Sequence, residues 1–189
     1  MPIQLNYQGG SDEVLNEAAA FSARRKVGGE GTVLASGDFL YRIFPTPQRV
    51  FFIKLDSGTD TTTAFIFGRI GHALQRHFTR DKRKAQVQAM VANFQGQRPA
   101  HLLSQDKANH VIPRGQITQP TIEPPSWWTG AKFGRFWFRD AKKRKRVFHF
   151  EDTESFLAAV NALRNAFGSA LIVRAEYDPT RNKIVKTKG

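Results

Sequence analysis

Residues 132–150 read KFGRFWFRDAKKRKRVFHF, and this stretch predicts a β-hairpin. Two runs rich in aromatic residues, 132–139 and 146–150, flank the turn-like segment DAKKRK. Because side chains alternate across a strand, Arg135, Trp137 and Arg139 share one face, and Phe136 and Phe138 share the other. The first face is predicted to be a binding platform and the second to enter the core.

The platform combines an aromatic ring with cations, which suits single-stranded nucleic acid. Rings stack on bases while Arg and Lys hold phosphates. The residues predicted to contact nucleic acid here are Arg135, Trp137, Arg139, Lys142, Lys143, Arg144, Lys145 and Arg146. The alternative interpretation is a solvated cationic turn, with the tryptophan buried by a partner element.

Regular elements are expected on both sides of the hairpin. Downstream, Asp152 or Thr153 caps a helix that Gly168 ends, and strands follow over 171–177 and 183–186. Upstream, Ser11 caps a helix reaching Lys26, because acids in its first turn and bases in its last complement the helix dipole. Short strands are expected over 32–35, 39–44, 49–55 and 61–67, and a helix over 68–94.

These elements predict an α+β fold. Its mixed or antiparallel sheet has short strands and is accompanied by three or four helices. A single domain over residues 1–189 is favoured. The alternative is a subdivision into 1–95 and 127–189, joined by a proline-rich crossover over 96–126.

The composition is that of a folded and strongly basic protein. Of the 189 residues, 40% are hydrophobic, and the net charge is +13. Polyanions, with nucleic acid first among them, are therefore the expected partners. The chain has no cysteine, which excludes disulfides, thiolate nucleophiles and cysteine-based metal sites. Because neither a signal-peptide pattern nor a long apolar run occurs, we expect a cytoplasmic protein with no membrane span.

The positive charge is confined to two segments. Residues 69–84 carry a net +5 and residues 132–146 a net +7. On a helix, the basic residues of the first segment would recur every three or four positions and form one stripe: Arg69, His72, Arg76, Arg80 and Arg83. This stripe is predicted to follow a polynucleotide, with a solvated helix face as the alternative.

Signals for catalysis are weak. No Walker A loop, Rossmann fingerprint, HExxH motif or nucleophile elbow is present. The segment 140–142 has the D-x-K form used by many nucleases, with Glu123 as a candidate second metal ligand. A turn-forming role for Asp140 is the favoured interpretation. The side chains of His101, Asn109 and His110 have nuclease-like types but the wrong spacing.

Residues 68–76, GRIGHALQR, follow the predicted strand TTTAFIF and predict a phosphate site. A strand, a glycine turn and a basic helix start place free amides and a positive dipole end together. We therefore expect Arg69, His72 and Arg76 to contact a phosphate or nucleotide.

The G-H-x-x-x-R pattern in this turn loosely resembles the phosphate-binding turn of the ParB/sulfiredoxin superfamily, although its His-to-Arg spacing is wider. Length, basicity and lack of cysteine are similar to plasmid fertility-inhibition proteins of that superfamily. The resemblance implies a ParB/sulfiredoxin-like fold, with ATPase and DNase activity that uses ATP and a divalent metal such as Mg²⁺. It also implies that the protein blocks DNA transfer by a type IV secretion system.

Three functional hypotheses follow. The first is a nucleic-acid-binding protein that acts as a nucleotide-regulated DNase. The second is a non-enzymatic inhibitor that covers an acidic protein partner, and the third is a structural RNA-binding protein.

Overall fold

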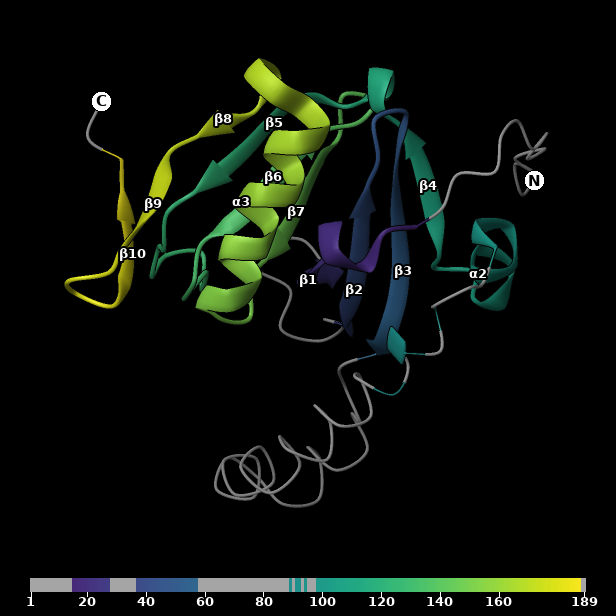
Figure 1. The fold of residues 1–189 in the computed structure, drawn as a ribbon, viewed down its shortest axis with the longest axis horizontal. Coiled ribbons are helices and arrows are strands. Elements are labelled where there is room, and N and C mark those ends of the chain that lie inside the picture. Colours follow the sequence, from purple (N-terminus) through teal and green to yellow (C-terminus); the bar gives the residue numbers. More distant parts are fainter. Residues whose placement is uncertain are drawn as a thin grey trace.

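The computed structural model describes residues 15–27, 37–57, 89, 91, 92, 94 and 98–187, and an eight-stranded sheet dominates this part of the chain (Figure 1). The strand order is β4-β3-β2-β1-β7-β6-β5-β8. The strands of this sheet are β1 (Phe21–Val27), β2 (Gly37–Pro45), β3 (Arg49–Ser57), β4 (His110–Pro113), β5 (Thr118–Glu123), β6 (Arg135–Arg139), β7 (Lys145–His149) and β8 (Ile172–Val173). The first seven pair antiparallel, and β8 joins β5 in parallel.

A second, two-stranded sheet pairs β9 (Ala175–Asp178) with β10 (Lys183–Lys186). Two α-helices occur among the described residues, α2 (Pro99–Gln105) and α3 (Thr153–Phe167). Three short 3-10 turns complete the described elements, η1 (Glu17–Ala19), η2 (Arg114–Gln116) and η3 (Gly168–Ala170). Neither described helix is long and apolar enough to cross a bilayer.

The large sheet is strongly curled around an aromatic core. The ring of Phe52 on β3 lies 5.2 Å from that of Phe148 on β7 and 5.9 Å from that of Phe138 on β6. In a flat sheet, β3 and β7 would be about 14 Å apart, because strands are spaced by about 4.8 Å. The curl therefore brings side chains from distant strands together on the inner face.

Helix α3 packs into this same core (Figure 1). Its apolar stripe is buried, and Phe156 meets Phe150 edge to face at 5.7 Å. The helix begins because Asp152 accepts a hydrogen bond from the Ser155 amide at 2.7 Å. It ends at Gly168, whose φ of 55° is costly for any residue with a side chain.

The opposite face of β2 and β3 has its own smaller core. Leu102 of α2 is fully buried there with Phe94, against apolar residues of the two strands that include Leu40, Phe51 and Ile53. Both faces of this part of the sheet are therefore covered.

The predicted α+β fold with three or four helices is wrong. The described residues form a β-rich fold with two α-helices, so the ParB/sulfiredoxin-like arrangement is not retained. One cause lies at residues 21–26, which were expected within a helix but belong to β1. Phe21 and Ala23 are fully buried and alternate with Ser22 and Arg24, and this period of two prevails over the charge order that favoured a helix.

The proline-rich segment, in which no strand or helix was expected, contains α2, β4 and β5 within residues 98–126. Three of its prolines show why they are compatible with these elements, because each sits where its missing amide is tolerated. Pro99 starts a helix, Pro113 ends a strand, and Pro120 lies within the irregular register between Thr118 and Thr121.

Several expected elements are confirmed: the strands over 39–44, 49–55 and 183–186, the 132–150 hairpin, and the helix from Asp152 to Gly168. The strand expected over 171–177 is divided into β8 and β9. The strands predicted over 32–35 and 61–67, and most of the helix over 68–94, lie outside the described residues.

Candidate nucleic-acid interface

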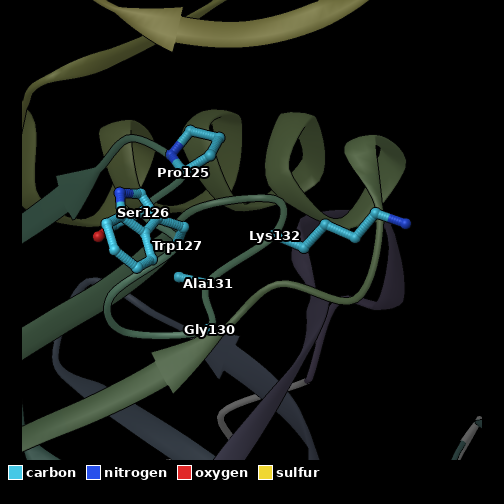
Figure 2. A pocket seen from close by; sticks show the side chains of 6 residues that line it. All are labelled: Pro125, Ser126, Trp127, Gly130, Ala131 and Lys132. Carbon is cyan, nitrogen blue, oxygen red and sulfur yellow. The ribbon is translucent and has the colours of Figure 1, made fainter.

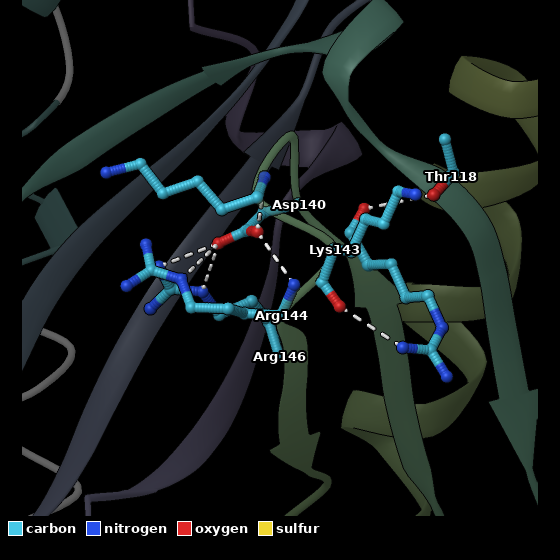
Figure 3. A network of polar contacts seen from close by, with 7 residues as sticks. Thr118, Asp140, Lys143, Arg144 and Arg146 are labelled. Atoms are coloured by element: carbon cyan, nitrogen blue, oxygen red, sulfur yellow. Dashed lines mark hydrogen bonds and ion pairs between the residues drawn. The ribbon is translucent and has the colours of Figure 1, made fainter.

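Asp140 holds the turn between β6 and β7. Its Oδ1 accepts hydrogen bonds from the amides of Lys142 (2.9 Å) and Arg144 (3.0 Å). Its Oδ2 accepts from Nε of Arg144 (3.3 Å) and Nε of Arg146 (3.0 Å) (Figure 3). The φ of Lys143 is 58°, as a tight turn requires. Asp140 is thus the structural centre of the turn, in agreement with the turn-forming interpretation.

The negative charge of Asp140 is neutralised by contacts within the turn. Burial favours the neutral acid, but the Arg144 amide and the Arg146 guanidinium outweigh it and lower the pKa of Asp140. It is the one acid within residues 132–146. The cations around it remain exposed to solvent, namely Arg139, Lys142, Lys143, Arg144 and Lys145. The turn is therefore a concentrated positive surface, called the cationic turn below.

The two arginines on the outer face of β6 differ in their availability. Arg135 is half-buried and forms an ion pair with Glu123, with an Nη2–Oε2 distance of 2.5 Å. Arg139 is exposed, and its Nη1 donates to the Lys143 carbonyl at 3.1 Å. Arg139 thus extends the cationic turn, whereas the charge of Arg135 is already balanced.

Trp137 lies between these arginines and is half-buried, while Phe136 and Phe138 on the other face are fully buried. The Lys145 ammonium lies over the Trp137 ring, 4.3 Å from its centroid. The indole nitrogen is buried without a hydrogen bond of normal geometry, yet it interacts with Glu123. Burial favours the neutral form of Glu123, but Trp137 and Arg135 together lower the pKa of that carboxyl.

A second aromatic feature, which the sequence analysis did not assign to the site, precedes β6. Trp127 and Trp128 are 77% and 79% exposed, and their rings stack with centroids 3.6 Å apart. They occupy a loop closed by reciprocal hydrogen bonds between the backbones of Ser126 and Ala131. Two adjacent tryptophans in a Pro-, Ser- and Gly-containing segment without strand alternation are the signal that could have identified them.

A pocket of about 350 Å³ lies beside Trp127 (Figure 2). Its lining residues are Pro125, Ser126, Trp127, Gly130, Ala131 and Lys132. Lys132 is exposed, and its side chain extends away from Trp127 (Figure 2), with its ammonium 5.4 Å from the centre of the Phe133 ring.

The predicted nuclease groups do not converge. Glu123 is opposite Arg135 at the start of β6, whereas Asp140 follows its end, which separates them by about 16 Å of strand. Asn109 has a structural role, since its Oδ1 accepts from the Lys54 amide at 2.7 Å and its Nδ2 donates to the Leu102 carbonyl at 2.7 Å. Within the described ranges, no three His, Asp or Glu side chains gather as a metal-binding group.

The predicted phosphate turn and basic stripe do not belong to the part of the chain that the structure describes. Arg69, His72, Arg76, Arg80 and Arg83 all lie outside the described residues. Of the predicted site residues, the structure brings together those of the hairpin.

Comparisons with protein families, curated proteins and solved structures gave no match to this chain. The functional argument therefore depends on the geometry of the site.

Proposed function

We propose that this protein binds nucleic acid through the cationic turn between β6 and β7. The observation that carries the proposal is the use of Asp140 inside the turn, which leaves five exposed cations without an exposed acid among residues 139–145. Such a surface attracts a polyanion and releases its counterions on binding. The ordered turn also reduces the entropy lost when the backbone binds.

Exposed aromatic rings favour an unpaired strand as the ligand. The stacked pair Trp127–Trp128 presents two outward ring faces to solvent. Bases stack on such faces at about 1–3 kcal/mol each, and they are accessible in single strands but hidden in a duplex. We therefore propose single-stranded DNA or RNA, with DNA favoured, in preference to an acidic protein partner.

Cleavage, ATP binding and inhibition of DNA transfer remain predictions that rest on the sequence resemblance. The phosphate or nucleotide contacts expected at Arg69, His72 and Arg76, and the cytoplasmic location expected from the lack of a signal-peptide pattern, also remain predictions. The binding experiment below therefore includes arms with Mg²⁺ and ATP, where cleavage would separate a DNase from a binding protein.

The proposal is tested by measuring fluorescence anisotropy of labelled single-stranded DNA, single-stranded RNA and duplex DNA. The test variant changes Lys142, Lys143 and Lys145 to Gln and retains Arg144, which helps to hold the turn. A matched variant changes Arg174, Lys183 and Lys186 to Gln, because these cations are also exposed but lie elsewhere.

The first variant should lose at least tenfold in affinity at low salt, and the second should lose little. Equal losses would show that net charge, not the turn, drives binding. Stronger binding to polyglutamate than to polynucleotides would instead favour an acidic protein partner.

A further inference from the structure

A group of arginines meets on the inner face of the curled sheet, beside the turn. Strands β1 and β7 pair antiparallel with Arg24 opposite His149. This register places Arg25 and Arg146 on the same face as diagonal neighbours. The fold thus brings together two arginines that are 121 positions apart in the sequence.

The charges in this group are unbalanced. Arg144 and Arg146 share the single carboxylate of Asp140, with Nε–Oδ2 distances of 3.3 and 3.0 Å (Figure 3). Arg25 interacts with the Tyr41 hydroxyl and is repelled by both other arginines. Among the described residues, no carboxylate forms an ion pair with Arg25. Within the part of the chain that the structure describes, three guanidinium groups therefore face one carboxylate, which leaves an excess of two positive charges.

The other described groups of this region do not supply the missing negative charge. Asp106, which acts on the same Tyr41, already pairs with Lys54 at 2.8 Å. His110 stacks on Phe52 with ring centroids 4.7 Å apart. Burial first, and then Arg25 and Arg146, lower the pKa of His110 and keep its ring neutral. Burial and then the charge of Arg146 also lower the pKa of Arg25.

The arginines retain unused hydrogen-bond donors. A guanidinium carries five N–H donors. Arg146 contacts Asp140 through Nε and Nη2, and Arg144 contacts it through Nε alone. Planar arrays of this kind match the oxygens of phosphate. A phosphate monoester carries a charge of about −1.5 to −2 at neutral pH, which equals the excess, whereas a backbone diester carries about −1.

We propose that Arg25, Arg144 and Arg146 form a site for a phosphate monoester, supplied either by the phosphorylated end of a polynucleotide or by a free mononucleotide. The proposal deepens the proposed function, on which its polynucleotide arm rests. Variants of Arg25 separate the phosphate site from binding by the cationic turn, because Arg25 lies on the inner face and outside that turn.

Two measurements test the site, the affinity for oligonucleotides and the melting temperature with free phosphate compounds. Single strands bearing a 5′-phosphate, a 3′-phosphate or only hydroxyl ends are compared by anisotropy. In a parallel arm, the protein is melted with inorganic phosphate or a mononucleotide, at constant ionic strength and with chloride as the reference. The variants are Arg25→Gln, Arg25→Lys and the exposed control Arg174→Gln.

A phosphorylated end should bind about tenfold more tightly than a hydroxyl end, the factor that one charge-assisted hydrogen bond supplies. Arg25→Gln should remove that preference and change the affinity for hydroxyl-ended strands by no more than about twofold. Without phosphate, its melting temperature should be no lower than that of wild type, because the substitution removes like-charge repulsion. Arg25→Lys should retain part of the preference for a phosphorylated end, and the control Arg174→Gln should retain all of it.

A preference only for the free compounds would assign the site to a mononucleotide. If no oligonucleotide binds but phosphate still raises the melting temperature through Arg25, the site stands and the proposed function fails. Absence of any Arg25-dependent response in both arms would overturn the site, as would a melting temperature of Arg25→Gln well below that of wild type.

Discussion

The ammonium of Lys145 lies 4.3 Å from the centre of the Trp137 ring, across the pair of strands that carries the cationic turn. This contact joins the first residue of β7 to the outer face of β6, and the ammonium covers one face of the indole ring. The indole nitrogen is buried as well. Trp137 therefore stabilises the hairpin, whatever it also contributes to binding.

Replacement of Trp137 by Ala should lower the free energy of unfolding by about 2–3 kcal/mol, because a half-buried ring and its cation contact are lost. Urea denaturation measures this loss, and Trp137→Phe should recover most of it. If Trp137→Ala instead unfolds like wild type but loses affinity for single strands, Trp137 is a stacking platform and not a support.

Replacement of Trp127 and Trp128 by Ala should weaken single-strand binding by about 1–3 kcal/mol per stacked base. Stability should change little, because both side chains are largely exposed. Duplex affinity should fall less, since paired bases hide their faces. Leu157→Ala, another exposed apolar side chain, is the control in the same anisotropy assay. Equal weakening of both ligands would argue against base stacking.

The affinity for single strands should fall steeply with salt. Each neutralised phosphate contributes about −0.7 to the slope of log K against log salt concentration. The Lys142, Lys143 and Lys145 variant should therefore flatten the slope by about 2, and the Trp127 and Trp128 variant should leave it unchanged. Binding that does not respond to salt would contradict the charge argument.

Asp140→Asn should destabilise the protein by about 1–3 kcal/mol, because a charged acceptor for two arginines becomes neutral. The affinity of the folded protein for nucleic acid should be unchanged or higher, since the turn loses its one negative charge. Thermal melts and anisotropy together check this. A specific loss of Mg²⁺-dependent cleavage at unchanged stability would instead make Asp140 a metal ligand.

Acidification should destabilise the protein partly through His110. Burial, Arg25 and Arg146 lower the pKa of His110 in the folded state below the ordinary value of 6.5. The unfolded chain therefore binds this proton more readily, so the contribution is complete above pH 6.5 and is lost as the pH falls below it. The fall in melting temperature between about pH 7.5 and 5.5 should be smaller in His110→Gln than in wild type. His101→Gln is the control, and an unchanged pH dependence in His110→Gln would contradict this assignment.

The sequence by itself determined the elements whose signals are local. The β6–β7 hairpin follows from side chains that alternate around a turn, and α3 from a capping Asp152, an apolar stripe and a terminal Gly168. The concentration of charge at the turn was equally visible, because it depends on neighbours in the chain. The exposed tryptophan pair could have been recognised from the same kind of local pattern.

Only the tertiary structure decided what depends on pairing between distant segments. Residues 21–27 became a strand because β2 and β7 lie on either side of them, and the proline-rich segment supplied β4 and β5 to sheet positions that no local pattern specifies. The curl brings Phe52 against Phe148, and the pairing of β1 with β7 brings Arg25 beside Arg146. Such contacts arise from the register and twist of the whole sheet, and for this reason the phosphate site could be inferred only after the strands were placed.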